Sequence, residues 1–228
     1  MNIEDLVLTP GGNRLLRETV HDQIRADILS LRLAPGTEMR EADLATRFEV
    51  SKSPVRDALM RLEREGLVIT LPRQGYRVAP VSLSDVQDMF HLRIALERAC
   101  MERIVRQASD EQLAGLEPFR RYERDAWAGG FIDYNRAFHR KLAELAGNPR
   151  MRDQLNNLID QMERVVLMSV NKATQNSGNP SGLVEEHCRM IDMLQQRQTK
   201  RAERLAAQHI AAAGKRVTEA ISRSIIAA

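Results

Sequence analysis

Three histidines and one asparagine are spaced so that they could gather at a single point. Asn135 and His139 lie four residues apart, a spacing that places two side chains on the same face of a helix. His187 and His209 fall in later helical segments, and the facing helices of a bundle can bring such side chains together. Imidazoles of this kind could bind a divalent metal ion. Histidines scattered over helices are more often structural, so the spacing alone leaves both interpretations open.

A second group of residues has the chemistry of DNA contact. Lys52, Ser53 and Arg56 lie at the start of a segment with helical periodicity, within the run Val-Ser-Lys-Ser-Pro-Val-Arg-Asp-Ala-Leu. The N-terminal residues of a helix reach base edges in the major groove, and the backbone N–H groups there favour phosphate. A guanidinium can bond a guanine bidentately, which favours Arg56 for base readout and leaves Lys52 and Ser53 for phosphates or a single base contact. The alternative is that Arg56 only solvates an exposed helix face.

The elements that would position these residues form a winged helix-turn-helix over residues 17–80, preceded by an N-terminal arm at 1–16. Apolar spacing predicts helices over about 17–31 and 41–48, followed by a turn at 49–52. Ser53 is expected to cap a third helix, with Pro54 at its first position and Gly66 at its end. The polar face of that helix carries Arg56, Asp57, Arg61 and Arg64, and we include Arg61 among the candidates for DNA contact.

A short hairpin follows this third helix. Residues 67–71 and 76–79 are separated by Pro-Arg-Gln-Gly and predict a two-stranded wing, with Gly75 supplying the turn conformation. Arg73 and Gln74 then lie at the tip. A minor-groove or phosphate contact is one interpretation of these two residues, and an ordinary hairpin tip is the other.

Positive and negative charges are balanced over this region as a whole, but positive charge predominates in one part of it. Residues 1–80 carry 12 Lys and Arg against 12 Asp and Glu, so the net charge of +3 for the whole chain is a weak indication of nucleic acid. Residues 47–77, however, carry seven basic side chains against four acidic ones. The positive charge is therefore local, as a docking face requires.

The rest of the chain predicts a mainly α fold with an all-α second domain over residues 81–228. Hydrophobic residues make up 43% of the 228 residues and aromatic residues only 4%, and good helix formers dominate after Pro80. Cys100 and Cys188 are isolated, which indicates neither a disulfide framework nor a zinc ribbon. No signal peptide or membrane span is evident, so we expect a soluble, cytoplasmic protein.

Capping signals and glycines divide this second domain into successive helices. Ser84 is expected to cap a helix that runs to about Ala108, and a capping box at 109–112 begins the next. The Gly129-Gly130 and Gly147-Asn148-Pro149 sequences bound a third helix. Further helices are expected over about 150–173, up to 197 and from 199 onwards, with the most loop-like stretch at 176–182.

The N-terminal pattern resembles the DNA-binding domain of the GntR family of bacterial transcription regulators. The matching pieces are Pro-Gly, Leu-Ala, Val-Ser-Lys-Ser-Pro-Val-Arg-Asp-Ala-Leu, Glu-Gly-Leu and Gly-Tyr-Arg-Val. In that family the second helix often begins with a basic residue that touches DNA. The corresponding position here is Ala42, with Arg40 nearby, so the resemblance adds Arg40 to the DNA-binding candidates.

The C-terminal domain resembles the FCD ligand-binding domain of the fatty-acid-regulator-like branch of that family. The matching pieces are Arg93-Ile-Ala-Leu-Glu97, Asn135-Arg-Ala-Phe-His139, Ala146-Gly-Asn148-Pro149, Glu186-His187 and His209. The resemblance implies a divalent metal held by a carboxylate and three histidines, at the positions of Asn135, His139, His187 and His209. Asn135 replaces the carboxylate with a weaker, neutral amide oxygen. Zinc or nickel in such a site would keep open positions suited to a small carboxylate effector.

The position of Arg93 in its predicted helix makes it a further candidate for this site. It falls within the inward face of its predicted helix, and a buried arginine needs a partner. One candidate partner is Glu97, four residues along the same helix. The other is the carboxylate of a small organic acid, which would make Arg93 an effector-binding residue.

Together these features favour a homodimeric transcription regulator that binds a palindromic DNA operator and is not an enzyme. The rival interpretation is an all-α metal-dependent enzyme that carries a DNA-binding module, because three histidines on a metal could activate water. Its general base is undefined, with Asp133, Glu185 and Glu186 as candidates by sequence proximity alone. A third interpretation is a nucleic-acid-associated scaffold that binds no ligand.

Overall fold

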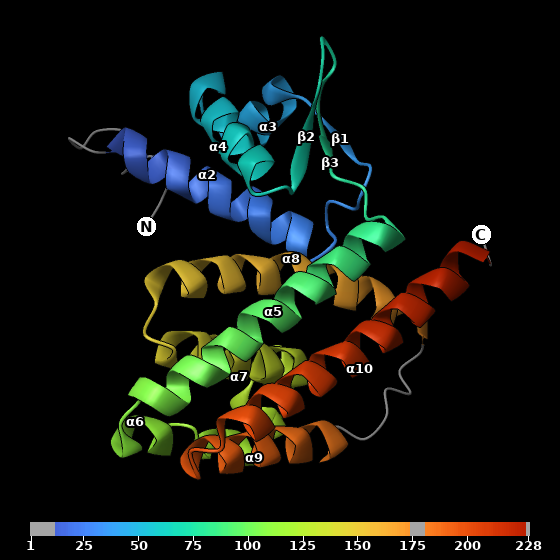
Figure 1. The fold of residues 1–228 in the computed structure, drawn as a ribbon. Coiled ribbons are helices and arrows are strands. Elements are labelled where there is room, and N and C mark those ends of the chain that lie inside the picture. The colour runs from blue at the N-terminus through green and yellow to red at the C-terminus, as the bar shows by residue number, and fades with distance from the viewer. Residues whose placement is uncertain (1–11, 174–180, 227–228) are drawn as a thin grey trace. The chain divides into compact units, whose positions relative to one another are not determined.

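The computed structural model describes the backbone of residues 12–173 and 181–226, and the side chains of most of them. The chain divides into two units, the first ending at Ser82 and the second beginning at Leu83. The described residues are mainly helical with one small sheet, as expected (Figure 1). None of the described helices is long and apolar enough to cross a membrane. Most of the predicted arm, and the predicted loop up to residue 180, lie outside the described residues.

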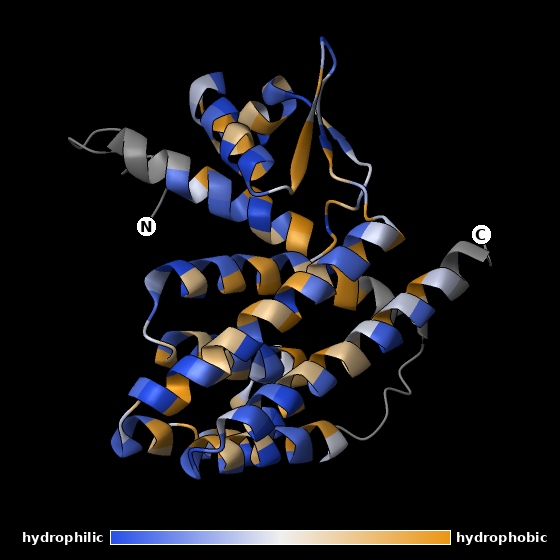
Figure 2. Ribbon diagram, in the orientation of Figure 1, coloured by the Kyte–Doolittle hydropathy of each residue, from blue (hydrophilic) through white to orange (hydrophobic). Residues whose placement is uncertain are grey.

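The described part of the first unit contains three helices and three strands. The helices are α2 (Gly12–Leu29), α3 (Glu41–Arg47) and α4 (Lys52–Arg64), and the strands are β1 (Glu38–Met39), β2 (Val68–Leu71) and β3 (Gly75–Val78). The strands pair antiparallel in the order β1-β3-β2, with Thr70 opposite Tyr76. Ile24, Leu59 and Val78 lie in a core formed by the apolar sides of these elements. Apolar residues recur among polar ones along α2 and α4, the pattern of amphipathic helices (Figure 2).

Three details of this unit differ from the sequence-based expectation. Helix α2 begins at Gly12, inside the predicted arm, because good helix formers follow Gly12 in the sequence. It ends at Leu29 rather than Leu31, since Leu31 adopts a left-handed conformation with φ of 62°. The two-residue strand β1 was not predicted, because so short a segment has no detectable periodicity.

The start of α4 also corrects a prediction. The helix begins at Lys52, its N-cap is Ser51, and Ser53 and Pro54 are its second and third residues. Ser53 is therefore not the cap. Pro54 is tolerated because the first turn of a helix has no internal partners for its N–H groups. The shift places Lys52 and Ser53 inside the first turn, where their side chains point outward and are exposed.

The turn of the wing depends on Gly75. Its φ of 115° lies in the region that favours glycine, and a Cβ atom there would lie 2.6 Å from the carbonyl oxygen of Met39. Gln74 donates its backbone N–H to the carbonyl of Leu71 at 3.0 Å, which closes the turn. The predicted role of Gly75 is confirmed, and the close approach of β1 adds a second reason for it.

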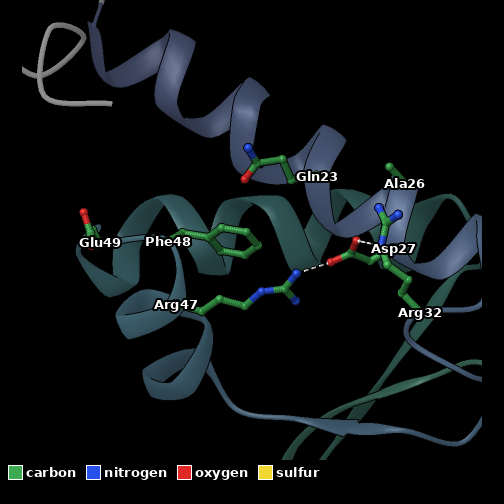
Figure 3. A pocket seen from close by; sticks show the side chains of 7 residues that line it. All are labelled: Gln23, Ala26, Asp27, Arg32, Arg47, Phe48 and Glu49. Atoms are coloured by element: carbon green, nitrogen blue, oxygen red, sulfur yellow. Dashed lines mark hydrogen bonds and ion pairs between the residues drawn. The ribbon is translucent and has the colours of Figure 1, made fainter. Parts of the chain in front are cut away.

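A buried carboxylate ties α2 to the end of α3. Asp27 accepts from Arg32 Nε at 2.6 Å and from Arg47 Nη2 at 2.5 Å, and Figure 3 shows its carboxylate between the two guanidinium groups. The Arg47 guanidinium also lies 5.0 Å from the ring centroid of Phe48. These residues line an open pocket, but their charges already satisfy one another. We assign the cluster a structural role in holding the helix-turn-helix against α2.

His21 provides a pH-dependent link between α2 and α4. Its Nε2 lies 2.7 Å from Glu65, and its Nδ1 lies 2.8 Å from Asp22. Arg25 also donates a hydrogen bond to Glu65. The positive charge of Arg61 disfavours protonation of the His21 ring. The hydrogen bond to Glu65, partly offset by burial, raises the pKa of His21. This contribution to stability is therefore complete below the unfolded pKa of about 6.5 and is lost as the pH rises through the folded pKa.

We expect the thermal unfolding midpoint of the N-terminal unit to fall between pH 6 and 8 by more in the wild-type protein than in His21→Gln. Calorimetry on the full chain over this range measures the difference. If the unfolding midpoint falls by the same amount with pH in both proteins, His21 does not link protonation to folding.

The second unit is a helical bundle built around one long helix. Its described helices are α5 (Leu83–Gln107), α6 (Asp110–Ala114), α7 (Gly130–Leu145), α8 (Pro149–Ala173), α9 (Ser181–Gln195) and α10 (Thr199–Ile226). Helix α5 contacts α7, α8, α9 and α10, and lies beside α10 along much of its length (Figure 1). The core gathers residues from all these helices around Met101, Phe138 and Ile191. Two short 3₁₀ helices at Glu117–Arg120 and Arg124–Ala126 were not predicted.

The helix boundaries of this unit follow most of the sequence signals. Ser109 caps α6 and exchanges both hydrogen bonds of a capping box with Gln112, as predicted. Ser84 is not a cap, because α5 begins one residue earlier at Leu83. Helix α9 ends at Gln195 rather than Arg197, which has a φ of 57° and cannot continue a helix. Cys100 is a buried free thiol, and Cys188 is a partly buried one.

The close contact between α5 and α10 depends on Gly214. A Cβ atom at this position would lie 2.9 Å from Cγ and 3.1 Å from Cδ1 of the buried Phe90 ring. Alanine normally improves a helix interior by about 1 kcal/mol over glycine. Overpacking of a core costs about 1–3 kcal/mol, so Gly214→Ala is expected to lower the unfolding midpoint of the C-terminal unit.

Gly182 in α9 is a matched control for this substitution, because a Cβ atom there would have no described atom within 4 Å. Gly182→Ala is expected to leave the midpoint unchanged or raise it. A gain in stability for Gly214→Ala, measured by the same calorimetry, would contradict the packing argument.

Candidate DNA-binding face and candidate metal centre

The residues predicted to touch DNA are mostly exposed on the first unit. The side chains of Lys52, Ser53 and Arg56 lie on one exposed face at the N-terminal end of α4. The same face continues along α4 to Met60, whose side chain is 49% exposed although it is apolar. An exposed apolar side chain on this face was not anticipated, because the helical period alone does not fix how far the buried stripe extends.

The remaining DNA-binding candidates divide into two groups. Arg40 is exposed at the N-cap of α3, and Arg73 and Gln74 are exposed at the tip of the wing, with Arg73 at a φ of 64°. Arg61 is only partly exposed, and its charge acts on His21 of α2. Arg61 therefore belongs to the side of α4 that packs near α2 rather than to the exposed face.

Arg56 is held by an acidic partner that the sequence analysis did not identify. Its Nε lies 2.8 Å from Oε1 of Glu41 and its Nη2 lies 2.7 Å from Oε2. This hydrogen bonding lowers the pKa of Glu41, so the carboxylate is charged at neutral pH. Arg56 is thus neither a simple solvated side chain nor a fully unpaired cation.

In the second unit the three predicted histidines meet. His139 of α7, His187 of α9 and His209 of α10 each offer a ring nitrogen, and these nitrogens lie within 4.8 Å of one another. The exposed fractions of these residues are 0%, 0% and 5%. Helices that are distant in the sequence therefore bring the imidazoles into one buried cluster.

Each imidazole is oriented by a hydrogen bond at its Nδ1. His139 Nδ1 lies 2.8 Å from Glu97 and His209 Nδ1 lies 2.5 Å from Glu186. A carboxylate can only accept, so Nδ1 carries the proton in both rings. His187 Nδ1 lies 3.2 Å from the hydroxyl of Tyr134, which donates its own proton to the carbonyl of Phe119 at 2.6 Å. The Tyr134 oxygen must therefore accept from His187.

This arrangement leaves the Nε2 lone pairs for another partner. The Nε2 atoms of His139 and His187 are buried and have no hydrogen-bond partner among the residues that the structure describes. Burial lowers the pKa of His139 to about 4, against the opposing charge of Glu97, and it also lowers the pKa of His187. Both rings are neutral at pH 7. Unprotonated imidazole nitrogens in a cluster of this size are the donor set that a zinc-like ion prefers, so these residues fit a metal.

Asn135 and Arg93 differ in their burial and in their connection to this histidine cluster. Asn135 lies one turn before His139 on α7 and is partly exposed. Arg93 is buried on α5, and its Nε donates to Oε1 of Glu97 at 2.7 Å. The intrahelical pair is therefore formed, and Glu97 connects Arg93 to His139. Burial would raise the pKa of Glu97, but His139 and Arg93 hold it at about 2.

The residues considered as a general base have other partners or positions. Asp133 accepts from the backbone N–H of Gly129 at 2.7 Å and from Arg136 at 2.8 Å. Glu186 orients His209, and this hydrogen bond lowers the pKa of Glu186. Glu185 is exposed on α9. Glu186 therefore orients the His209 ring, a contact that the sequence did not reveal.

These two units define a class of protein. A winged helix-turn-helix with an exposed basic helix N-terminus is a DNA-binding module, and it is joined here to a helical domain with a buried histidine cluster. This is the organisation of a transcription regulator with a separate effector-binding domain.

Comparison with known proteins identifies the family. Residues 16–78 match bacterial regulatory proteins of the gntR family, and residues 88–212 match the FCD domain. The chain is 28% identical to the HTH-type transcriptional repressor RspR of Escherichia coli strain K12 over 199 residues, 86% of each chain. It is 31% identical to the uncharacterized HTH-type transcriptional regulator BphR of Paraburkholderia xenovorans over 208 residues, 86% of this chain and 83% of that one.

A solved structure supports the same assignment at the level of the fold. E. coli McbR/YncC aligns with a TM-score of 0.70 at 19% identity, covering 86% of this chain and 93% of that chain. The chain belongs to the GntR family of bacterial transcription regulators and carries an FCD effector-binding domain.

Proposed function

We propose that this regulator binds a palindromic operator as a homodimer, and that binding of a small carboxylate changes its affinity for the operator. Arg56 reads a guanine in each half-site, and Lys52 and Ser53 contact phosphates or single bases. Arg40, Arg73 and Gln74 add backbone or minor-groove contacts, whereas the position of Arg61 beside His21 favours a supporting role. The proposal is supported by the shared exposed face of Lys52, Ser53 and Arg56 at the start of α4.

The effector half of the proposal depends on the histidine cluster. His139, His187 and His209, with Asn135 as a weak fourth ligand, hold one divalent ion such as zinc or nickel. The observation that carries this is the pair of buried Nε2 atoms on His139 and His187, which have no partner within the described part of the chain. When bound, the ion supplies a positive centre with open positions that attract an anionic ligand. Glu97, Tyr134 and Glu186 keep the rings in the required orientation.

Arg93 provides a second positive charge near this centre. Its contact with Glu97 uses Nε, and a guanidinium has two further nitrogens with which it can bind a carboxylate. A small organic acid that reaches both Arg93 and the histidine centre would favour one arrangement of the bundle. A preference of about 1.4 kcal/mol between two arrangements changes operator affinity tenfold.

Elemental analysis of protein purified without a histidine tag tests the proposed centre. We expect about one zinc or nickel ion per chain, because three oriented imidazoles form the protein part of such a site. Protein that carries no stoichiometric metal, and takes up none on dialysis against zinc or nickel, would return the histidines to a structural role.

Dimerisation is the other testable part of this proposal. A single winged helix contacts few base pairs, whereas a two-fold dimer reads two half-sites about 34–36 Å apart. Light scattering is therefore expected to give twice the chain mass of 25.9 kDa. A monomer at micromolar concentration, still binding a single half-site, would contradict the two-fold arrangement.

A further inference from the structure

The pair between Glu41 and Arg56 joins the two helices of the helix-turn-helix. Glu41 is the first residue of α3 and Arg56 is the fifth residue of α4. Both carboxylate oxygens are used, at 2.8 Å to Nε and 2.7 Å to Nη2. Such two-bond geometry fixes the plane of a guanidinium, which a single contact does not.

The surroundings of Glu41 hold the carboxylate in place. A negative charge in the first turn of a helix is stabilised by the N-terminal end of the helix dipole, and Glu41 occupies that turn of α3. The hydroxyl of Tyr76 on β3 lies 3.5 Å from Oε1, and the positive charge of Lys52 also acts on the carboxylate. The side chain of Glu41 is 20% exposed, whereas that of Arg56 is 58% exposed. The carboxylate is therefore the fixed partner and the arginine is the outward-facing one.

The geometry leaves the outer part of Arg56 available for DNA. A guanidinium has five N–H groups, and the edge formed by Nε and Nη2 uses two of them. The edge formed by Nη1 and Nη2 is the one opposite the side-chain stem, and it can bond O6 and N7 of guanine at the same time as the first edge binds a carboxylate. The two bidentate contacts are compatible.

We propose that Glu41 is a specificity-determining positioning residue, which aims Arg56 at a base and prevents it from acting as a general phosphate contact. This inference rests on the proposed role of Arg56 in base readout. By holding one edge of the guanidinium, Glu41 limits the rotamers of a long, flexible side chain before DNA arrives. By neutralising its charge, Glu41 also weakens the attraction to phosphates that any DNA sequence offers.

The opposite role would be that of a competing charge. In that case the Glu41 carboxylate has to be displaced before Arg56 can bind DNA, and its removal would strengthen operator binding. The use of the Nε–Nη2 edge favours the positioning role, because no displacement is needed for the other edge to meet a guanine. The two roles predict opposite signs for the same substitution.

The test uses full-length protein and two DNA duplexes. One is the duplex that the wild-type protein recovers from a random-sequence library, and the other is a scrambled duplex of the same length and composition. For Glu41→Gln we expect operator affinity to fall about tenfold while affinity for scrambled DNA stays the same or rises. The salt dependence of binding to scrambled DNA should become steeper, because each unmasked arginine adds about one counterion to the slope.

Two further variants separate geometry from charge. Glu41→Asp keeps the charge but is one methylene too short to reach both nitrogens, so it should lose specificity without a change in the salt slope. Glu38→Gln is the matched control, since Glu38 pairs with Arg77 of the wing at 2.7 Å and the charge change is identical. Its operator affinity should stay within about twofold of the wild type, as expected for an exposed ion pair.

The outcomes separate this inference from the proposed function. Tighter operator binding by Glu41→Gln, or specificity equal to that of the wild type, would overturn the positioning role. Arg56→Ala is measured beside it. If that variant binds the operator normally, the base-reading role of Arg56 is wrong. If it loses operator binding while Glu41→Gln does not, only the role of Glu41 is wrong. Equal melting curves for the N-terminal unit confirm that each variant is folded.

Discussion

Arg56→Ala is expected to lower operator affinity by roughly 30-fold to more than 10,000-fold, because a bidentate base contact contributes about 1–3 kcal/mol in each of two half-sites. Salt-sensitive binding to unrelated DNA should persist, since that depends on phosphate contacts from other residues. Fluorescence anisotropy at fixed salt, with the duplex recovered by the wild-type protein and a scrambled one, measures both effects.

Arg64→Ala is the matched control for this prediction. Arg64 lies on the same helix, and its substitution removes the same charge. It lies at the C-terminal end of α4, at the other end of the helix from the residues that we propose reach base edges. We expect at most a small, sequence-independent loss from it. Equal losses for Arg56→Ala and Arg64→Ala would mean that α4 contributes charge and no base readout.

His187→Ala is expected to remove the metal and with it the response to effector. The substitution deletes one of the three clustered imidazoles, together with the hydrogen bond to Tyr134 and the stacking on Phe138, whose ring centroid lies 4.0 Å away. Metal content should fall from about one ion per chain to near zero. A ligand present at 100 times its dissociation constant stabilises a protein by about 2.7 kcal/mol, so a chelator should lower the melting midpoint of the wild type and not of the variant.

His91→Ala is the control for this variant, because His91 is exposed on α5 in the same unit. It should retain metal, effector response and melting behaviour. His187→Ala should still bind the operator in the absence of effector, since the first unit carries the DNA contacts. A variant that retains stoichiometric metal would contradict the assignment of His187 as a ligand. Chelation that leaves the wild-type melting curve unchanged would contradict a metal that stabilises the bundle.

Most of the fold could be predicted because its elements have local signals. The apolar stripe of α4, the capping box at Ser109 and Gln112 and the turn at Gly75 all depend on neighbouring residues. The errors arose where local signals compete. Ser51 and Ser53 are equivalent as cap residues in the sequence, and only the packed structure shows that the helix begins after the first of them.

The candidate sites were less accessible to sequence reasoning, because their partners are distant along the chain. The spacing of Asn135 and His139 predicted one shared face, but the orientation of His139 depends on Glu97, 42 residues away. The pair between Arg56 and Glu41 joins two helices and residues 15 positions apart, and no periodic pattern in the sequence predicts it. Long-range polar pairs of this kind follow from the tertiary fold and leave no signature in either segment alone.

Arg93 illustrates how one residue can satisfy two interpretations. Its spacing to Glu97 predicted the intrahelical pair, which the structure contains. Its burial predicted a polar partner, and Glu97 meets that requirement while also orienting His139. The structure therefore links Arg93 to the histidine cluster through Glu97, a connection that the spacing rule could not supply.

Selection of binding sites from a random-sequence duplex library tests the central claim most directly, namely that two copies of this chain read a two-fold symmetric DNA sequence through α4. We expect the wild-type protein to recover duplexes that share two inverted half-sites about one helical turn apart, with a guanine at the same position in each half. Recovered duplexes that share no motif, or that carry only one half-site, would contradict it.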